Sequence, residues 1–401
     1  MLIEIGKKNT QKNFFFEKLL SLSIIKHKNY NVDKKLNNIK KIKARNPSID
    51  FARILSMYAI IIHHILVFGR VYIKYIQFKE LILMNISCFW HVSSYALISG
   101  YIGYKTNKYS NLLYLWILVF FYSLGITYIF GKYNSKLIIE KIEFIDYFPF
   151  YFDKYWYFTK YFGMYLFLPV INKGIVSLDK NELKFVVISL ILVYVILKDI
   201  INPKQDILLM NKGYSVIWLL IFYITGAYFG KFRKEYNGIK RIIFIIICIL
   251  IFSLSTYFCF YFKYYSPDNQ KDFLKMKIMK ILKQLFILRI SSFPMILQSI
   301  FLVLLLTQIK YNKYLTKIIV FLGPLTFGVY IIHMHPIVLN HIIRKSFDKE
   351  PNKISLSIVM KLLLIRGLKI FGICSIIDYF RYILFLFLRI RKLCLLIDKI
   401  I

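Results

Sequence analysis

Long runs of apolar residues, separated by short polar segments, make up most of the chain. Most runs are roughly 17 to 25 residues long, the length at which a helix crosses about 30 Å of hydrocarbon. The amphipathic stripes and alternating strands typical of a soluble protein do not occur in these runs. The pattern predicts ten spans, at residues 51–68, 81–103, 111–130, 156–172, 185–197, 214–230, 242–262, 288–308, 319–343 and 370–388.

The last part of the chain is less regular than the rest. Lys361, Arg366 and Lys369 interrupt the apolar residues that lead to the final span. Charged side chains are costly within a membrane unless they are paired, so we expect a surface or re-entrant helix here, before the tenth span. The predicted fold class is all-α: a polytopic integral membrane helical bundle of about ten transmembrane helices.

Both ends of the chain are polar and basic. Residues 1–45 are rich in lysine and contain neither a continuous apolar segment nor the small-residue cleavage site of a secretory signal. We expect them to form a basic cytoplasmic tail with a short surface helix near residues 14–25. The transmembrane domain then covers residues 46–391, and residues 392–401 form a short cytoplasmic C-terminal tail.

Charges between the spans predict the orientation in the membrane. Loops 104–110, 231–241 and 310–317 are basic, as cytoplasmic loops usually are, whereas loop 131–155 is balanced in charge. Loop 263–289 does not fit, because it is basic and the same scheme places it outside. The pattern as a whole predicts a multi-pass protein of the cell (plasma) membrane with a cytoplasmic N-terminus.

The composition favours lipid over nucleic acid as a partner. Hydrophobic residues make up 58% of the 401 positions, and the mean hydropathy is +0.57. The formal net charge is +36, although lysine is abundant together with isoleucine, asparagine, tyrosine and phenylalanine, as an AT-rich genome favours. Because the lysines lie in short loops rather than on one basic face, we expect contact with the lipid bilayer and no nucleic acid.

Cysteine and histidine show no pattern typical of a metal site. The five cysteines have no CxxC spacing and mostly lie within apolar runs, which predicts buried free thiols rather than disulfides. The histidines lack the spacing of metal ligands, so no metal is expected. The histidines considered are His63, His64, His91, His333 and His335.

Ionisable residues of the first span share one helical face. Asp50 and Arg53 are three residues apart and can pair, and His64 follows Arg53 by eleven residues, which returns it to nearly the same azimuth. The face therefore carries a carboxylate and a guanidinium at its cytoplasmic end and an imidazole roughly 16 Å deeper. His63 points about 100° away from His64, and we expect it to be structural.

Two interpretations fit this face equally well. An acyl-CoA donor can place its phosphates at Arg53 and its thioester near His64, whose neutral imidazole can act as a general base. Alternatively, Asp50 and Arg53 anchor the helix end at the headgroups, and His64 is a packing residue.

Four segments together resemble the acyltransferase-3 family of membrane acyltransferases. The segment IDFARILSMYAIIIHHIL has an arginine, ten further residues and a histidine at the start of the first helix, like the family signature. The other three follow in family order: YALISGYIGYKTNKYSNLLYLWILVFFYS, YWYFTKYFGMYLFLPVINK and FLGPLTFGVYIIHMHP. The resemblance covers residues 45–391 and is greatest to the branch found with Gram-positive capsule and exopolysaccharide genes.

The resemblance also implies roles for individual residues. Arg53 and His64 correspond to the two essential residues, and Asp50 to the acid ahead of the arginine. Outside the resemblance, His333 shares a helical face with Tyr330 and can orient His64 or the acceptor. The candidate sites are catalytic His64, Arg53 and His333, donor-binding Asp50, Arg53, Lys105 and Lys108, and acceptor-binding Trp156, Tyr161 and Tyr330.

Several of these positions have a second interpretation. Lys105 and Lys108 stand where many members carry arginines, and lysine meets a phosphate as a point charge without the bidentate fork. Trp156 and Tyr161 can stack on a sugar, or they can belong to an aromatic belt at the membrane surface. Ser99 and Gly100 are expected to permit close packing of helices rather than to take part in catalysis.

The implied function is that of an O-acyltransferase, most simply an O-acetyltransferase. Acetyl-CoA or another acyl-CoA would be a substrate from the cytoplasm, with no tightly bound cofactor, and the acceptor would be a cell-surface polysaccharide or its lipid-linked precursor. The alternative is a transporter or exporter of that polysaccharide, since ten spans with internal polar residues suit both. Transporters commonly contain paired repeats, however, and the aspartate-arginine-histidine face has no second copy in the sequence.

Overall fold

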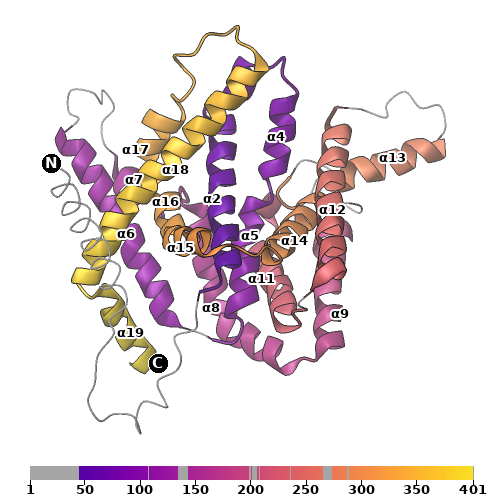
Figure 1. Ribbon diagram of the computed structural model, residues 1–401, viewed down its shortest axis with the longest axis horizontal. Helices are drawn as coiled ribbons and strands as arrows, with labels where there is room; N and C mark the ends of the chain where they lie inside the picture. Colours follow the sequence, from indigo (N-terminus) through magenta and orange to yellow (C-terminus); the bar gives the residue numbers. More distant parts are fainter. Residues whose placement is uncertain are drawn as a thin grey trace, which may run out of the picture. The chain divides into compact units, whose positions relative to one another are not determined.

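Helices form every regular element in the described part of the chain (Figure 1). The computed structural model describes residues 45–106, 108–133, 143–197, 200, 206, 208–234, 236–264, 273–286 and 289–400. By its internal contacts the chain divides into Met1–Arg45 and Asn46–Ile401, and the second unit is described below. The predicted N-terminal tail and its surface helix, residues 1–44, lie outside the described residues.

Five helical segments of the described chain are long and apolar enough to cross a membrane. They are α2 (Pro47–Phe68), α4 with α5 (Glu80–Cys88 and His91–Gly103), α6 (Tyr109–Tyr133), α12 (Gly238–Tyr264), and α15 with η4 and α16 (Lys313–Leu322, Gly323–Leu325 and Thr326–His333). Two shorter apolar helices are α11 (Val216–Lys231) and α14 (Phe293–Thr307).

Helices also occupy the other three predicted positions. These are α8 (Trp156–Ser177), α9 continuing into η2 (Lys180–Ile191 and Leu192–Leu197), and α18 (Leu356–Phe387). The all-helical membrane class is thus confirmed, whereas the number of ten spans stays a prediction.

Shorter helices join these segments or follow them. They are α3 (Val71–Lys74), α7 (Phe144–Tyr147), η3 (Asn211–Gly213), α13 (Phe273–Leu285), α17 (Pro336–Val338), η5 (Leu339–Ile343) and α19 (Ile390–Ile400). The predicted span 319–343 is therefore divided: α16 ends at His333 and α17 begins at Pro336, which lacks the N–H needed to continue a helix. The segment predicted as a C-terminal tail belongs to α19, which packs against α6.

The surface or re-entrant helix predicted before the last span was wrong, because α18 is continuous from Leu356 to Phe387. Arg366 lies in its first half and pairs with Glu350, and it also donates to the carbonyl of Ser346. Its guanidinium lies 4.3 Å from the ring centroid of Phe347. These partners come from the segment before α18, so the charge is satisfied without breaking the helix.

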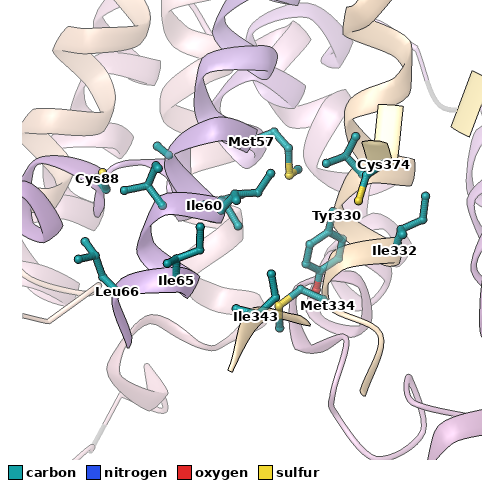
Figure 2. Packing of buried hydrophobic residues seen from close by; sticks show 14 of the residues in the cluster. Met57, Ile60, Ile65, Leu66, Cys88, Tyr330, Ile332, Met334, Ile343 and Cys374 are labelled. Atoms are coloured by element: carbon teal, nitrogen blue, oxygen red, sulfur yellow. The ribbon is translucent and has the colours of Figure 1, made fainter. Parts of the chain in front are cut away.

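Helix α2 lies among the other helices and contacts α4, α5, α14, α15, α16 and α18 (Figure 1). It begins at Pro47, and the side chain of Asn46 accepts the free N–H of Ser48. Its apolar side chains enter the core: Figure 2 shows Met57 and Ile60 of α2 in one cluster with Tyr330 of α16. This packing places the face predicted to carry chemistry inside the bundle.

Helices α5 and α11 are in backbone contact. A Cβ at Gly100 would overlap the carbonyl of Tyr223, and one at Gly226 would overlap the carbonyl of Leu97. Only glycine permits this approach, as in other membrane helix pairs with small residues at their interface. The packing role predicted for Gly100 is confirmed.

All five cysteines are free and buried, as the sequence predicted. They are Cys88, Cys248, Cys259, Cys374 and Cys394. Each therefore acts as a small apolar side chain that becomes accessible only when the protein unfolds.

Candidate functional site

One cavity brings histidines of α2 and α5 together with aromatic residues of α8 and α16. Its volume is about 70 Å³, which suits the reacting ends of two substrates rather than a whole acyl-CoA. Its lining consists of Met57, Ile60, His63, His64, His91, Val92, Tyr95, Trp156, Tyr157, Tyr214, Ile290, Phe327 and Tyr330. Polar groups thus converge on a largely apolar pocket, the usual form of a small-molecule site.

A chain of hydrogen bonds fixes the protons on two of its imidazoles. His64 Nδ1 lies 3.0 Å from His333 Nε2, and His333 Nδ1 lies 2.6 Å from the carbonyl oxygen of Val329. Because a carbonyl only accepts, His333 Nδ1 must carry a hydrogen, and Nε2 of the neutral ring is then an acceptor. It accepts the hydrogen on His64 Nδ1, which leaves His64 Nε2 unprotonated.

The two histidines differ in access to the cavity. His333 is 0% exposed, whereas His64 is partly exposed and lines the cavity. His64 can therefore touch a substrate, and His333 can act only through His64. A reachable ring with a bare nitrogen, oriented by a second fixed group, is the arrangement that general-base catalysis requires.

Arg53 lies on the same helix as His64 but outside the cavity lining. Its Nη1 is 2.8 Å from Asp50 Oδ1, and the side chains of Arg53 and Asp50 are 23% and 2% exposed. Tyr95 connects the two regions, because its ring lines the cavity and its hydroxyl donates to the carbonyl of Arg53 at 2.8 Å. Arg53 and His64 therefore do not contact each other, and Tyr95 lies between them.

The predicted acceptor residues lie in and beside the cavity. Trp156 and Tyr330 line it, and the buried hydroxyl of Tyr330 has no hydrogen-bond partner among the described residues. Tyr161 does not line it, and its hydroxyl lies 3.2 Å from Ser99 Oγ instead.

The predicted donor residues Lys105 and Lys108 are exposed and lie between α5 and α6. Helix α5 passes the cavity at His91 and meets Arg53 through Tyr95, so the lysines follow at the Arg53 end of the bundle. Of the predicted site residues, the structure brings His64, Trp156 and Tyr330 together at the cavity, with His333 behind His64. The others lie outside the cavity lining: Asp50, Arg53, Lys105, Lys108 and Tyr161.

A second Asp–Arg pair, which the sequence analysis missed, is buried in α18. Arg381 Nη2 lies 2.5 Å from Asp378 Oδ2 and its Nε lies 3.0 Å from Oδ1, with exposures of 3% and 0% for the two side chains. Tyr122 donates to Asp378 at 2.8 Å, and Arg381 donates to the Tyr114 hydroxyl at 2.7 Å. The sequence does indicate this pair, because an aspartate and an arginine stand three residues apart within an apolar run.

Both carboxylates pack against glycines of the segment that carries His333. A Cβ at Gly323 would lie 2.7 Å from Asp50 Cβ and Cγ. A Cβ at Gly328, five residues before His333, would overlap the carboxylate of Asp378. Through these two contacts α2 and α18 fix the position of η4 and α16, and hence of His333.

Several lining residues carried no sequence signal. His63 was predicted to be structural; it borders the cavity, and its Nδ1 lies 2.7 Å from Asn85 Oδ1. Tyr157 belongs to α8 and Tyr214 lies just before α11. Both border the cavity through the packing of α11 against α5 and α8, which the sequence does not reveal. Within the described ranges no group of three or more histidine, cysteine, aspartate or glutamate residues is placed to hold a metal ion.

Comparison with protein families gives a match over most of the chain. Residues 46–386 match the model of the acyltransferase-3 family, which is described as an acyltransferase domain. No curated protein and no solved structure matches the chain. The match spans the bundle from the start of α2 into the last turn of α18, and the capsule and exopolysaccharide branch stays a prediction.

Proposed function

Because the chain belongs to the acyltransferase-3 family of membrane acyltransferases, we propose that it transfers an acetyl group from cytoplasmic acetyl-CoA to a sugar hydroxyl. The acceptor is a cell-surface polysaccharide or its lipid-linked precursor in the cell membrane. The observation that carries the proposal is the bare Nε2 of His64, held in place by His333 and facing a cavity bordered by aromatic rings.

His64 acts as the general base of the transfer. Its Nε2 takes the proton of the acceptor hydroxyl while the hydroxyl oxygen bonds to the thioester carbonyl carbon. The C–S bond then breaks, and the CoA sulfur takes the proton back from His64. His333 keeps its hydrogen bond to His64 Nδ1 throughout, which stabilises the transient imidazolium and holds the ring in place.

Arg53 and the nearby lysines hold the charged part of the donor. The phosphates of acetyl-CoA stay at the end of the bundle where Arg53, Lys105 and Lys108 lie, since phosphate is costly to bury in hydrocarbon. Arg53 and His64 are eleven residues apart on α2, roughly 16 Å along a helix. A flexible pantetheine arm spans that distance past Tyr95 and brings the thioester to His64.

The acceptor enters at the aromatic side of the cavity. Trp156 and Tyr214 form an edge-to-face pair with ring centroids 4.5 Å apart, and aromatic rings of this kind pack against the apolar face of a sugar. Tyr330 adds a further aromatic ring to the lining of the same cavity.

The test is the transfer of labelled acetyl from acetyl-CoA to deacetylated surface polysaccharide by the purified protein in lipid nanodiscs. His64→Phe removes the base and keeps an aromatic ring, so the rate falls about 10²- to 10⁴-fold. His341→Phe is the matched control, because His341 lies in η5 outside the cavity lining and should leave the rate unchanged.

The same pair of variants separates the enzyme from an exporter in cells. With His64→Phe, surface polysaccharide is still exported but lacks the acetyl mass. Loss of export together with full acetylation of the remaining polymer would instead support a transporter, and normal acetylation would remove His64 from the mechanism.

A further inference from the structure

Two further histidines border the same cavity as His64. His63 belongs to α2 and His91 to α5. His63 Nδ1 lies 2.7 Å from Asn85 Oδ1, and His91 Nδ1 contacts the carbonyl of Cys88. Both partners are oxygen acceptors, so each Nδ1 carries its ring's hydrogen and each neutral ring has a bare Nε2.

The three cavity imidazoles are therefore in the same tautomer and close together. The ring centroid of His63 lies 5.6 Å from that of His64 and 5.2 Å from that of His91. No hydrogen bond within the described part of the chain engages the Nε2 of His63 or of His91. Three hydrogen-bond acceptors thus border one small space, and the proposed mechanism uses only the one on His64.

Such a group of acceptors selects the chemistry of its ligand. Carboxylates and phosphates bring further acceptors, so their lone pairs would face those of the imidazoles without a hydrogen between them. Metal coordination requires ligand nitrogens about 2.1 Å from one point. The three imidazoles do not form such a group, and no other set of three among the described residues does. A ligand with several hydroxyl groups, by contrast, donates one hydrogen bond to each ring.

We propose that His63 and His91 recognise the acceptor sugar by accepting hydrogen bonds from hydroxyls next to the one acylated at His64. The ligand class is a polyol with at least three neighbouring hydroxyls, such as a pyranose unit. The inference rests on the proposed function, because it assigns His64 to the reacting hydroxyl. His63 and His91 thereby determine which hydroxyl of the sugar reaches the base.

The other lining residues suit the rest of such a ligand. Val92, Ile60 and Phe327 add apolar surface, against which the C–H face of a sugar packs. Trp156, at the start of α8, adds an indole ring to the cavity lining. A sugar ring has both a hydroxyl edge and an apolar face, and this lining offers a partner for each.

The experiment measures where the acetyl group goes. The surface polysaccharide of cells producing wild-type protein, His63→Phe or His91→Phe is analysed by NMR for the acetylated position. Deacetylated polysaccharide then serves as the probe for the KM of each purified protein. We expect each Phe variant to raise the KM for polysaccharide about tenfold, the loss of one hydrogen bond worth about 1.4 kcal/mol, and to spread the acetyl over more than one hydroxyl.

Glutamine variants separate recognition from a structural role. His63→Gln and His91→Gln keep an acceptor oxygen and should restore most of the affinity for polysaccharide and the single acetylated position. The KM for acetyl-CoA should equal the wild-type value in all four variants, the two Phe and the two Gln substitutions. An unchanged polysaccharide KM and position in the Phe variants would overturn the inference. So would a loss of kcat and folded protein that glutamine does not rescue.

The same experiment distinguishes failure of the proposed function from failure of the recognition role. If the proposed function is wrong, the wild-type protein itself adds no acetyl to the polysaccharide. Alternatively, the wild type is active and loses activity on His64→Phe, while His63→Phe and His91→Phe show the wild-type KM and acetylated position. That result would overturn the recognition role of His63 and His91 and leave the proposed function intact.

Discussion

Two Asp–Arg pairs with the same spacing lie in different surroundings. Asp50–Arg53 begins α2, and its arginine keeps 23% of its side chain exposed. Asp378–Arg381 lies inside α18, where exposures are 0% and 3% and two tyrosines complete the network. The identical sequence spacing therefore yields an arginine that can meet a ligand in one place and a closed structural network in the other.

The number of partners explains the difference. All three guanidinium nitrogens of Arg381 donate hydrogen bonds to Asp378 or Tyr114. Arg53 uses Nη1 on Asp50, and its side chain stays 23% exposed. Since a buried ion pair is tolerated only when its hydrogen bonds are satisfied, Asp378–Arg381 holds α18 against α6 and α16 rather than binding substrate.

The same substitution in both pairs should give opposite results. Arg381→Lys loses the fork that meets Asp378 and the bond to Tyr114, so it should lower the free energy of unfolding by about 3 kcal/mol. Arg53→Lys should change stability by less than about 1 kcal/mol but should reduce acyl transfer at least tenfold if the guanidinium holds a donor phosphate. Thermal unfolding followed with a thiol-reactive dye measures the change in stability, because all five cysteines are buried in the folded protein.

Either the stability measurement or the activity measurement can contradict the different roles assigned to the two pairs. Equal loss of stability in both variants would mean that the pairs are both structural, whereas full activity of Arg53→Lys would count against a role in donor binding.

Glycine substitutions should rank the two pairs in the same way. Gly328→Ala forces a methyl group into the Asp378 carboxylate and should cost about 1–3 kcal/mol, with a matching fall in activity as His333 is displaced. Gly323→Ala meets Asp50 at the less severe distance of 2.7 Å and should cost less. Melting temperatures of the two variants measure the order, and a larger loss at Gly323 would contradict it.

The partly exposed carboxylate of Asp398 should give the smallest effect. Hydrogen bonds from the hydroxyl and the backbone N–H of Ser110 lower the pKa of Asp398 in α19, with Lys108 and Arg391 adding to the shift. Because the pKa is lower when α19 is docked, docking is favoured above the ordinary aspartate pKa of about 3.9 and weakens as the pH falls through the lowered value.

Hydrogen exchange can follow this docking directly. Amide protection of α19 should fall modestly when the pH is lowered from 7 to 3, after correction for intrinsic rates, while α2 stays protected. Asp398→Asn should remove this pH dependence, and a pH-independent α19 in the wild type would show that the Ser110 contact does not matter.

Local patterns were enough to predict the positions of the long apolar helices and one face of α2. Span length gave the helical positions, and the eleven-residue spacing on α2 gave Arg53 and His64. The His64–His333 hydrogen bond joins residues 269 positions apart, so no periodicity could supply its geometry. The continuity of α18 past Arg366 was missed for the same reason, because its partners lie in a preceding loop.

The second Asp–Arg pair was missed for a different reason. Its spacing is readable in the sequence, but spacing alone does not reveal that Tyr114 and Tyr122 of α6 and Gly328 of α16 enclose it. Sequence therefore locates such pairs, and burial decides what each one does.

We propose that His333 acts only by orienting His64, and a double-mutant cycle in kcat/KM for acyl transfer tests this role most directly. Wild type, His64→Phe, His333→Phe and the double variant are compared per folded protein. We expect each single variant to lose activity and the double variant to be no slower than His64→Phe. Losses that multiply in the double variant, or full activity of His333→Phe, would contradict the account.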